Sequence, residues 1–224
     1  KMVQEVFTLS PSSLNLMQEC PRCFWLAMHK KWKRPAGVFP SLPSGMDRVL
    51  KAHFDKFMKL GKLPPELCEN KECRNLKLFD DEELLAVWRN NRKGISWEDE
   101  KGNVLKGAVD NLLVNKQGKL VVLDYKTRGF PLKEDTAEHY QMQLDVYCYL
   151  LKMNGYECED FAFLLFYVPD KVLENGDVMF ETSLVKMNVD GGNGKRVFNE
   201  ALKLLSGSCP AAHQDCEWCV DVEV

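Results

Sequence analysis

Hydrophobic and polar positions predict helices in the first part of the chain. Ser10-Pro11 is typical of a helix start, because Ser caps the first turn and Pro needs no backbone donor there. Pro21, in the run Cys20-Pro21-Arg22-Cys23, is expected to interrupt this helix. Residues 34–45 are rich in Pro, Gly and Ser and predict a loop. We expect helices over residues 44–60 and 80–92, the first with an apolar stripe of Val49, Leu50, His53, Phe54 and Phe57.

The pattern changes to strands near residue 104. Two β-rich runs flank Lys116-Gln117-Gly118, which predicts a hairpin loop with Gly in the left-handed position. A helix, two strands and a last helix are expected to follow. The predicted strands cover 104–115, 119–127, 161–168 and 178–187, and the predicted helices cover 135–154 and 194–206. This order predicts an α/β fold with a mixed sheet flanked by helices, and nothing marks a clean domain boundary.

The predicted hairpin brings two carboxylates together. If the loop covers residues 116–118, Asn115 lies opposite Lys119, and the numbers of any two paired residues add up to 234. Asp110 is then expected opposite Asp124. Lys126 shares their face because side chains alternate along a strand. The rest of this face is apolar: Leu112, Val114, Leu120 and Val122.

Like charges on facing strand positions are destabilising, so this pair needs an explanation. Mg²⁺ or Mn²⁺ provides one, because hard cations bind carboxylates together with waters and phosphate oxygens. An ammonium beside them can offset the charge that grows on a phosphate during its transfer. The alternative is a structural ion cluster of Asp110, Lys126 and Asp124.

Composition narrows the class of protein. The chain has 224 residues, is 45% hydrophobic and 28% charged, and has a net charge of −3, so we expect a globular protein. The longest apolar runs, such as 161–168, fall well short of the ~18 residues that span a membrane. The first residues lack an apolar signal region, so we expect a cytoplasmic protein without membrane contact. Residues 22–62 contain ten Lys or Arg but only two acidic residues. This excess predicts a basic patch that binds a polyanion, and the alternative is a helix surface exposed to solvent.

Cysteine spacing predicts a metal site. Cys20-x-x-Cys23 and Cys216-x-x-Cys219 form two matched pairs among nine cysteines. Such pairs suit tetrahedral Zn²⁺ or an iron–sulfur cluster, and a shared site would join the two ends of the chain. The alternative is two independent pairs without metal. Among the remaining cysteines, Cys68 and Cys73 are expected in a loop as exposed thiols, and Cys148 and Cys158 are expected to be buried or idle.

Several motifs, in this order, resemble those of the PD-(D/E)XK nuclease superfamily. Val109-Asp110 precedes Val121-Val122-Leu123-Asp124-Tyr125-Lys126-Thr127, and Gln143-x-x-x-Tyr147 looks like the Gln-x-x-x-Tyr motif of RecB-type nucleases. His53 sits where that group carries a metal-binding histidine. Leu9–Ser13 followed by Cys20-Pro21-Arg22 is similar to the opening of RecB-like CRISPR-associated exonucleases and AddB-type nuclease domains.

The resemblance implies roles for individual residues. His53, Asp110, Asp124 and the backbone carbonyl of Tyr125 would bind the divalent ion. Lys126 would position or help to activate the attacking water. Gln143 and Tyr147 would support the lysine or a DNA phosphate, whereas His139 and His29 receive no role.

The resemblance also implies a [4Fe–4S] cluster, although Zn²⁺ remains the alternative. Cluster nucleases of this type usually combine one early cysteine with three late ones. This chain therefore allows two quartets: Cys20, Cys23, Cys216 and Cys219, or Cys20 with Cys209, Cys216 and Cys219. We favour the first for its matched spacing, and His213 is a weaker candidate ligand.

Together these features predict a restriction-endonuclease-like domain over residues 1–224. Its helical segment 9–62 and cysteine tail 207–224 would be joined by the metal site. The expected activity is Mg²⁺- or Mn²⁺-dependent hydrolysis of DNA, as an exonuclease on DNA that is single-stranded or has a free end. A helicase or a CRISPR or recombination protein is the expected partner. The alternatives are a non-catalytic DNA-binding or assembly module and a redox-responsive metal protein.

Overall fold

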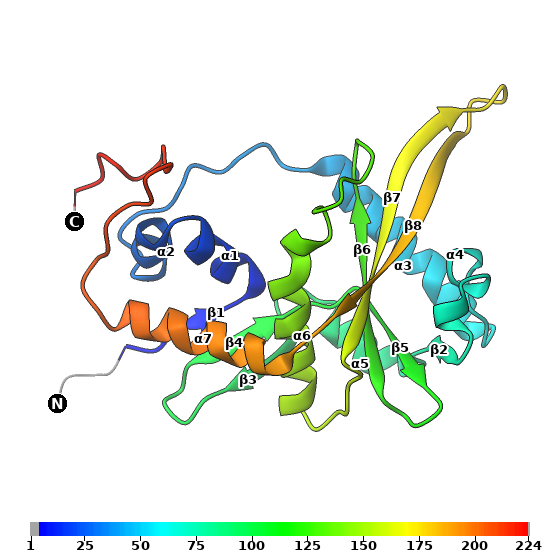
Figure 1. Cartoon of the computed structure of the whole chain (residues 1–224), viewed down its shortest axis with the longest axis horizontal. Helices are drawn as coiled ribbons and strands as arrows, with labels where there is room; N and C mark the ends of the chain where they lie inside the picture. The colour runs from blue at the N-terminus through cyan, green and yellow to red at the C-terminus, as the bar shows by residue number, and fades with distance from the viewer. Residues whose placement is uncertain (1–4, 224) are drawn as a thin grey trace.

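A computed structural model describes residues 5–223 of the chain, so residues 1–4 and 224 of the expected domain lie outside the described residues (Figure 1). The α-helices are α1 (Pro11–Glu19), α2 (Pro21–Met28), α3 (Ser41–Lys59), α4 (Pro65–Cys68), α5 (Glu82–Trp88), α6 (Gln141–Met153) and α7 (Gly191–Leu205). The strands are β1 (Thr8–Leu9), β2 (Leu76–Leu78), β3 (Ile95–Glu98), β4 (Val104–Gly107), β5 (Asn111–Asn115), β6 (Leu120–Thr127), β7 (Phe161–Val172) and β8 (Val178–Asn188). Short 3-10 turns cover Lys71–Cys73 and Glu138–Tyr140.

The first two helices begin and end as the sequence predicts. Ser10 caps α1 and forms a reciprocal capping box with Ser13. Cys20 is extended, ends α1 and begins α2, with Pro21 in the first turn of α2. Pro21 therefore separates two helices, because it has no N–H with which to continue α1.

The central sheet has five strands in the order β2-β5-β6-β7-β8. Only β6 and β7 run parallel within it, so the sheet is mixed, as expected. The β5–β6 hairpin has the predicted register, with Leu112 opposite Val122, and Gly118 has a φ of 83° in the loop. A second sheet has the order β1-β4-β3 and includes a parallel β1–β4 pair.

Strand alternation divides the apolar residues between two cores. On one face, Leu112, Val122 and Phe166 pack in the cluster that includes α1, α6 and α7. On the other face, α3 packs on the sheet through Leu50 and Phe54. Each fully buried side chain of this size stabilises the fold by about 2 kcal/mol.

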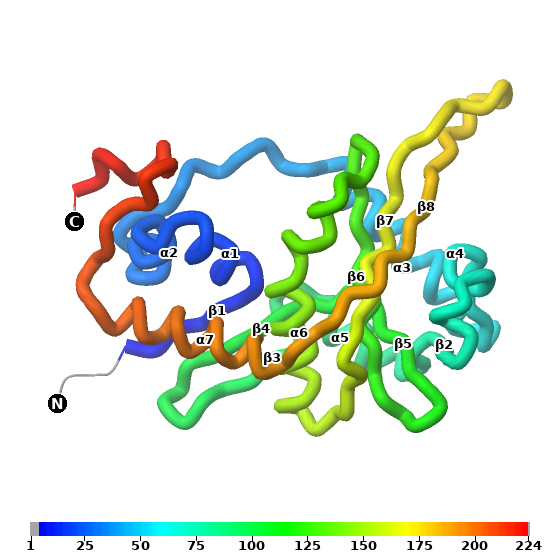
Figure 2. Tube along the Cα trace, in the orientation of Figure 1, coloured from blue at the N-terminus to red at the C-terminus, as the bar shows by residue number. Residues whose placement is uncertain are grey.

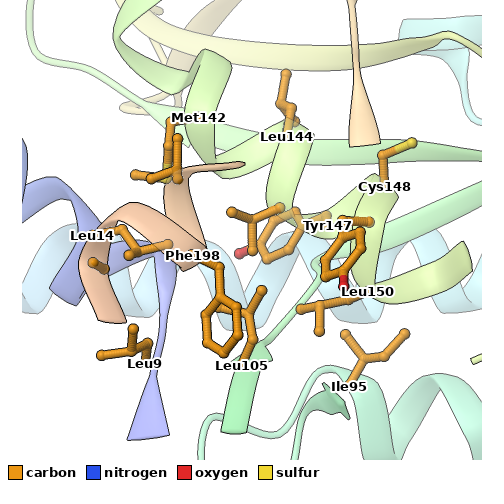
Figure 3. Packing of buried hydrophobic residues seen from close by; sticks show 14 of the residues in the cluster. Leu9, Leu14, Ile95, Leu105, Met142, Leu144, Tyr147, Cys148, Leu150 and Phe198 are labelled. Carbon is orange, nitrogen blue, oxygen red and sulfur yellow. The ribbon is translucent and has the colours of Figure 1, made fainter. Parts of the chain in front are cut away.

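Helix α6 lies at the centre of the larger core. Figure 3 shows Leu144, Tyr147 and Leu150 of this helix among side chains from β1, β4 and α7, including Phe198. α6 is buried over most of its length, and α7 packs along it. The helix that carries Gln143 and Tyr147 is therefore fixed from several sides.

The sequence predictions differ from the structure at several elements. β1, β2 and β3 were not predicted, and the helix predicted over 135–154 begins at Gln141. Residues 104–115 form two strands in different sheets, because the chain leaves β4 at Gly107 before it enters β5. Helix α3 begins at Ser41, so part of the predicted loop is helical, and Val49 is exposed rather than part of the apolar stripe. α5 is shorter than the predicted helix over 80–92.

The tail that follows α7 returns to the second helix of the chain. Figure 2 shows this tail running beside α2. The Arg22 guanidinium in α2 donates to the carbonyls of Pro210 and Val222 in this tail, at 3.3 and 2.6 Å. Within residues 5–223, none of the helices combines the length and apolar character that crossing a lipid bilayer requires.

Candidate active site

The hairpin places Asp110 and Asp124 side by side at one end of the central sheet. The paired register ends with Asn111 opposite Leu123, and Asp110 and Asp124 are the residues that adjoin this last pair. Asp110 Oδ2 accepts a hydrogen bond of 3.0 Å from the backbone N–H of Tyr125. The Lys126 ammonium forms an ion pair with Asp124, so both carboxylates and the lysine meet at one point.

Asp124 occupies an unfavourable place for a lone carboxylate. The residue is 1% exposed, and burial raises the pKa of its carboxyl to about 7. This value includes the nearby charge of Asp110, which also raises the pKa, and the ion pair with Lys126, which lowers it. A carboxylate pair in this position favours binding of a proton or a cation.

Gln143 and Tyr147 reach this point from α6. Gln143 Nε2 lies 3.4 Å from Asp124 Oδ1, and the Lys126 ammonium donates to Gln143 Oε1 at 3.3 Å. Gln143 also donates to the Tyr147 hydroxyl, which donates to the carbonyl of Ala108, both at 2.7 Å. One turn of helix therefore connects the carboxylates to the segment between β4 and β5.

Gly107 makes room for the Tyr147 ring. A Cβ atom at this position would lie 2.6 Å from a carbon of the ring, so no larger residue fits without displacing it. Tyr147 is nearly buried, and burial raises the pKa of its hydroxyl well above the ordinary value. The hydroxyl therefore stays protonated and acts as a fixed hydrogen-bond donor.

These side chains form the floor of a cleft of about 500 Å³. Lys93 and Lys106 lie on its wall, and neither was expected there from the sequence. The cleft is lined by Ser10, Pro11, Ser12, Asn15, Asn91, Lys93, Gly94, Lys106, Gly107, Ala108, Asp110, Asp124, Lys126, Gln143 and Tyr147. A larger cavity of about 940 Å³ lies elsewhere, between the segment before β1, the turn from β3 to β4, and α7.

Helix α3 approaches the carboxylates through Lys51 instead of His53. The Lys51 ammonium lies 3.1 Å from Asp110 Oδ1 and 2.8 Å from Asp47 Oδ1, so it bridges the two acids. Sequence reasoning missed this contact, although the spacing of Asp47 and Lys51 by four residues was the available signal. Arg89 also approaches, donating to the carbonyl of Asp110 at 2.7 Å.

The structure places His53 away from the carboxylate pair. Its Nε2 lies 3.1 Å from Glu66 Oε1, and Tyr167 donates to the same carboxylate at 3.0 Å. His53 is not among the residues that line the cleft in the described chain. The expected grouping of His53 with Asp110 and Asp124 is therefore not found.

Comparisons with known proteins agree with this geometry. The sequence profile of the PD-(D/E)XK nuclease superfamily matches residues 8–220. The chain belongs to this superfamily. Nucleases of this superfamily use divalent metal ions, and the mixed sheet flanked by helices is consistent with their fold.

Other comparisons add little beyond the fold. Nineteen chains of known structure match this PD-(D/E)XK protein. One of them is described as the crystal structure of SSO0001, with 17% identity and a TM-score of 0.45. The match covers 90% of this chain and 78% of that one. Among curated proteins, none matches the sequence.

This PD-(D/E)XK protein also brings four cysteines together. The sulfur atoms of Cys20, Cys23, Cys216 and Cys219 all lie within 4.8 Å of one another, and all four residues are buried. They come from α2 and from the tail after α7, which are the two regions that the sequence predicts to meet. Four thiols at this spacing can hold a metal.

The remaining candidate ligands lie outside this quartet. Cys209 accepts a weak hydrogen bond from Arg22 Nη1 at 3.6 Å, and the His213 ring lies 3.7 Å from Asp215. Cys73 is buried, which corrects the expectation of two exposed thiols in this region, whereas Cys68 is exposed.

Proposed function

We propose that this protein is a divalent-metal-dependent deoxyribonuclease that hydrolyses phosphodiester bonds. The observation that carries the proposal is the carboxylate pair Asp110 and Asp124, which faces one cleft together with Lys126. Membership of the superfamily supports a nuclease. The dependence on Mg²⁺ or Mn²⁺ and the choice of DNA go beyond that membership and belong to the proposal.

The residues present fit a hard divalent cation. Asp110, Asp124 and the backbone carbonyl of Tyr125 offer oxygen atoms, which Mg²⁺ and Mn²⁺ prefer. The burial and raised pKa of Asp124 indicate a carboxylate whose charge needs a partner. We leave His53 out of the ligand set because it pairs with Glu66. The bound cation would act as a Lewis acid on the scissile phosphate and lower the pKa of a coordinated water.

The protein's own side chains position the reactants. Lys126 is held by Asp124 and by Gln143, and its ammonium lies 4.6 Å from the centre of the Tyr140 ring. This fixed cation can orient a water and offset negative charge on the phosphate in the transition state. Gln143 and Tyr147 hold the side chains of Lys126 and Asp124 in fixed positions relative to each other.

The cleft suits one DNA backbone. Lys93 and Lys106 provide positive charge on its wall, and Ser12 and Asn15 of α1 provide polar groups opposite. Four cations of the basic segment have other partners. Arg22 binds the tail and Lys51 binds Asp47 and Asp110, while Arg34 pairs with Glu19 and Lys59 with Glu82. We therefore propose that the cleft lysines, more than residues 22–62 as a whole, contact the phosphates.

The substrate that we propose is single-stranded DNA or DNA with a free end, cleaved as an exonuclease. The RecB-like motifs support this choice, as they support a helicase or a CRISPR or recombination protein as partner. We further propose that residues 1–224 form one nuclease domain whose cysteine site has a structural role. It would hold α2 and the tail together, and with them the start of α1, which contributes Ser10 and Ser12 to the cleft.

Cleavage of end-labelled linear DNA and of circular single strands tests this function. We expect degradation of the linear strand with Mg²⁺ or Mn²⁺, no degradation with EDTA, and no cleavage by Asp124→Ala. Asp135→Ala is the matched control, because Asp135 is exposed and is not among the residues that line the cleft. Cleavage of the circle would contradict a strict exonuclease. Salt-sensitive DNA binding by folded protein without any cleavage would indicate the non-catalytic module instead.

A further inference from the structure

The sulfur atoms of the cysteine quartet are in direct contact with one another. Cys20 and Cys219 have their Sγ atoms 3.6 Å apart, and Cys23 and Cys216 have theirs 3.6 Å apart. The Sγ atoms of Cys216 and Cys219 are separated by 3.7 Å. These distances connect both CxxC pairs into a single compact group of four sulfurs.

The distances between these Sγ atoms match those between ligands that surround a single ion. Zn²⁺ binds thiolates at about 2.3 Å in a tetrahedron, which places neighbouring sulfurs about 3.8 Å apart. A [4Fe–4S] cluster carries each thiolate on a different iron, so its outer sulfurs lie further apart, on the order of 6 Å. Sulfur atoms in contact leave a hole for one ion and no space for a cube of iron and sulfide.

The arrangement of the two pairs also suits a single ion. The ligands come as two cysteines from each end, as in tetrahedral zinc sites built from two short turns. Backbone N–H groups of Trp218 and Cys219 donate to Cys216, and the His213 N–H donates to Cys20 Sγ at 3.5 Å. Such bonds orient the ligand sulfurs and disperse the negative charge of a four-thiolate site.

The Arg34 guanidinium, which also pairs with Glu19 at 2.6 Å, offsets part of the remaining charge. Four thiolates around a divalent ion leave a net charge of −2. Arg34 lies with Nη2 4.0 Å from Cys216 Sγ, and Arg22 lies between the tail carbonyls and Cys209. Cys209, the fourth ligand of the alternative quartet, is therefore a neighbour of Arg22 and not a member of the group.

We propose that Cys20, Cys23, Cys216 and Cys219 bind one Zn²⁺ ion as a tetrahedral site, in place of the [4Fe–4S] cluster that the family resemblance implies. This inference rests on the structural metal site in the proposed function, but not on DNA cleavage. The zinc ion joins the first and last parts of the fold without redox chemistry.

Metal analysis of the whole chain tests the proposal. The protein is purified without oxygen from cells supplied with both iron and zinc, and its zinc, iron and acid-labile sulfide are measured. We expect about one zinc per chain, with neither iron nor sulfide in stoichiometric amount. Iron in place of zinc, with or without sulfide, would overturn the assignment, as would folded protein that holds no metal.

Cobalt exchange and two variants keep the test independent of folding defects and of activity. Replacement of the metal by Co²⁺ in the wild-type chain should give the visible bands of tetrahedral cobalt bound to thiolates, and an octahedral spectrum would contradict the site. Cys209→Ser should retain the zinc, whereas Cys219→Ser should lose most of it. Asp124→Asn should retain the zinc fully. A failure of nuclease activity would leave all of these readings unchanged.

Discussion

Replacement of Asp124 by Asn should stabilise the metal-free protein. Asp124 is buried beside Asp110, and the pKa of its carboxyl is raised from an ordinary value of 3.8 to about 7. The folded protein therefore holds this proton more tightly than the unfolded chain does. Stability from this group is fully present below about pH 4, falls as the pH rises, and reaches its lowest level above about pH 7.

The size of the effect follows from the shift. About three pKa units at 1.36 kcal/mol each give a cost of about 4 kcal/mol at pH 8 for keeping Asp124 ionised. Asn removes this charge and keeps the shape, and the shift already includes the attraction of Lys126, but the amide does not reproduce every hydrogen bond of the carboxyl, which reduces the gain. We expect a net gain of roughly 2 kcal/mol, or about 4–8 °C in Tm, for a chain of this length.

Thermal unfolding in EDTA between pH 5 and pH 8 measures this effect. The Tm of the wild type should fall over this range more steeply than that of Asp124→Asn. Mg²⁺ at 100 times its Kd should stabilise the wild type by about 2.7 kcal/mol and leave the variant unchanged. Asp135→Asn, at an exposed position, should behave as the wild type in both tests. A variant less stable than the wild type at pH 8 in EDTA would refute the reasoning.

Three further predictions concern residues around the cleft. Lys93→Ala should weaken DNA binding measured by fluorescence anisotropy, and the slope of log binding constant against log salt concentration should become smaller by about 1. Lys116→Ala, in the hairpin loop, should change neither the affinity for DNA nor this slope. Tyr147→Phe removes both hydrogen bonds of the hydroxyl, so the free energy of unfolding measured in denaturant titrations should fall by about 1–3 kcal/mol. The kcat of this variant should fall more than its KM changes, because Gln143 loses an anchor. A kcat equal to that of the wild type would contradict this role. Lys51→Met removes a cation next to the carboxylates, so calorimetry should show Mg²⁺ binding several-fold more tightly, and weaker binding would contradict the argument.

The carboxylate pair was predictable because it depends on local geometry. A three-residue loop fixes the hairpin register, which brings Asp110 and Asp124 to the same end of the hairpin, and Lys126 follows Asp124 by two residues on the same face. The cysteine quartet was predictable for a different reason. Matched CxxC spacing at the two ends allowed a shared site, although which cysteine joins it depended on how the tail folds over α2.

The contribution of α3 was not predictable from periodicity alone. Its buried positions, Leu50 and Phe54, fix how the helix is rotated on the sheet. At ~100° per residue, Lys51 then lies on one flank of the buried stripe and His53 on the other. The sequence shows that His53 is near the stripe, but only the packing shows which flank faces the carboxylates.

The break between β4 and β5 was hidden for a similar reason. Residues that favour β-strands run through 104–115, so the sequence predicts a single strand there. They separate because β4 pairs with β1 and β3, while β5 pairs with β2 and β6, and these two sets of partners belong to different sheets. The turn between them provides the carbonyl of Ala108 to Tyr147.

Single-turnover cleavage of a labelled DNA strand tests the central claim most directly. Wild type, Lys126→Ala and Lys116→Ala are compared in Mg²⁺ and in EDTA, with thermal unfolding confirming that each is folded. The account predicts metal-dependent cleavage by the wild type and by Lys116→Ala, and a loss of at least about 100-fold in rate for Lys126→Ala. Cleavage by Lys126→Ala at the wild-type rate would contradict a site built on Asp110, Asp124 and Lys126.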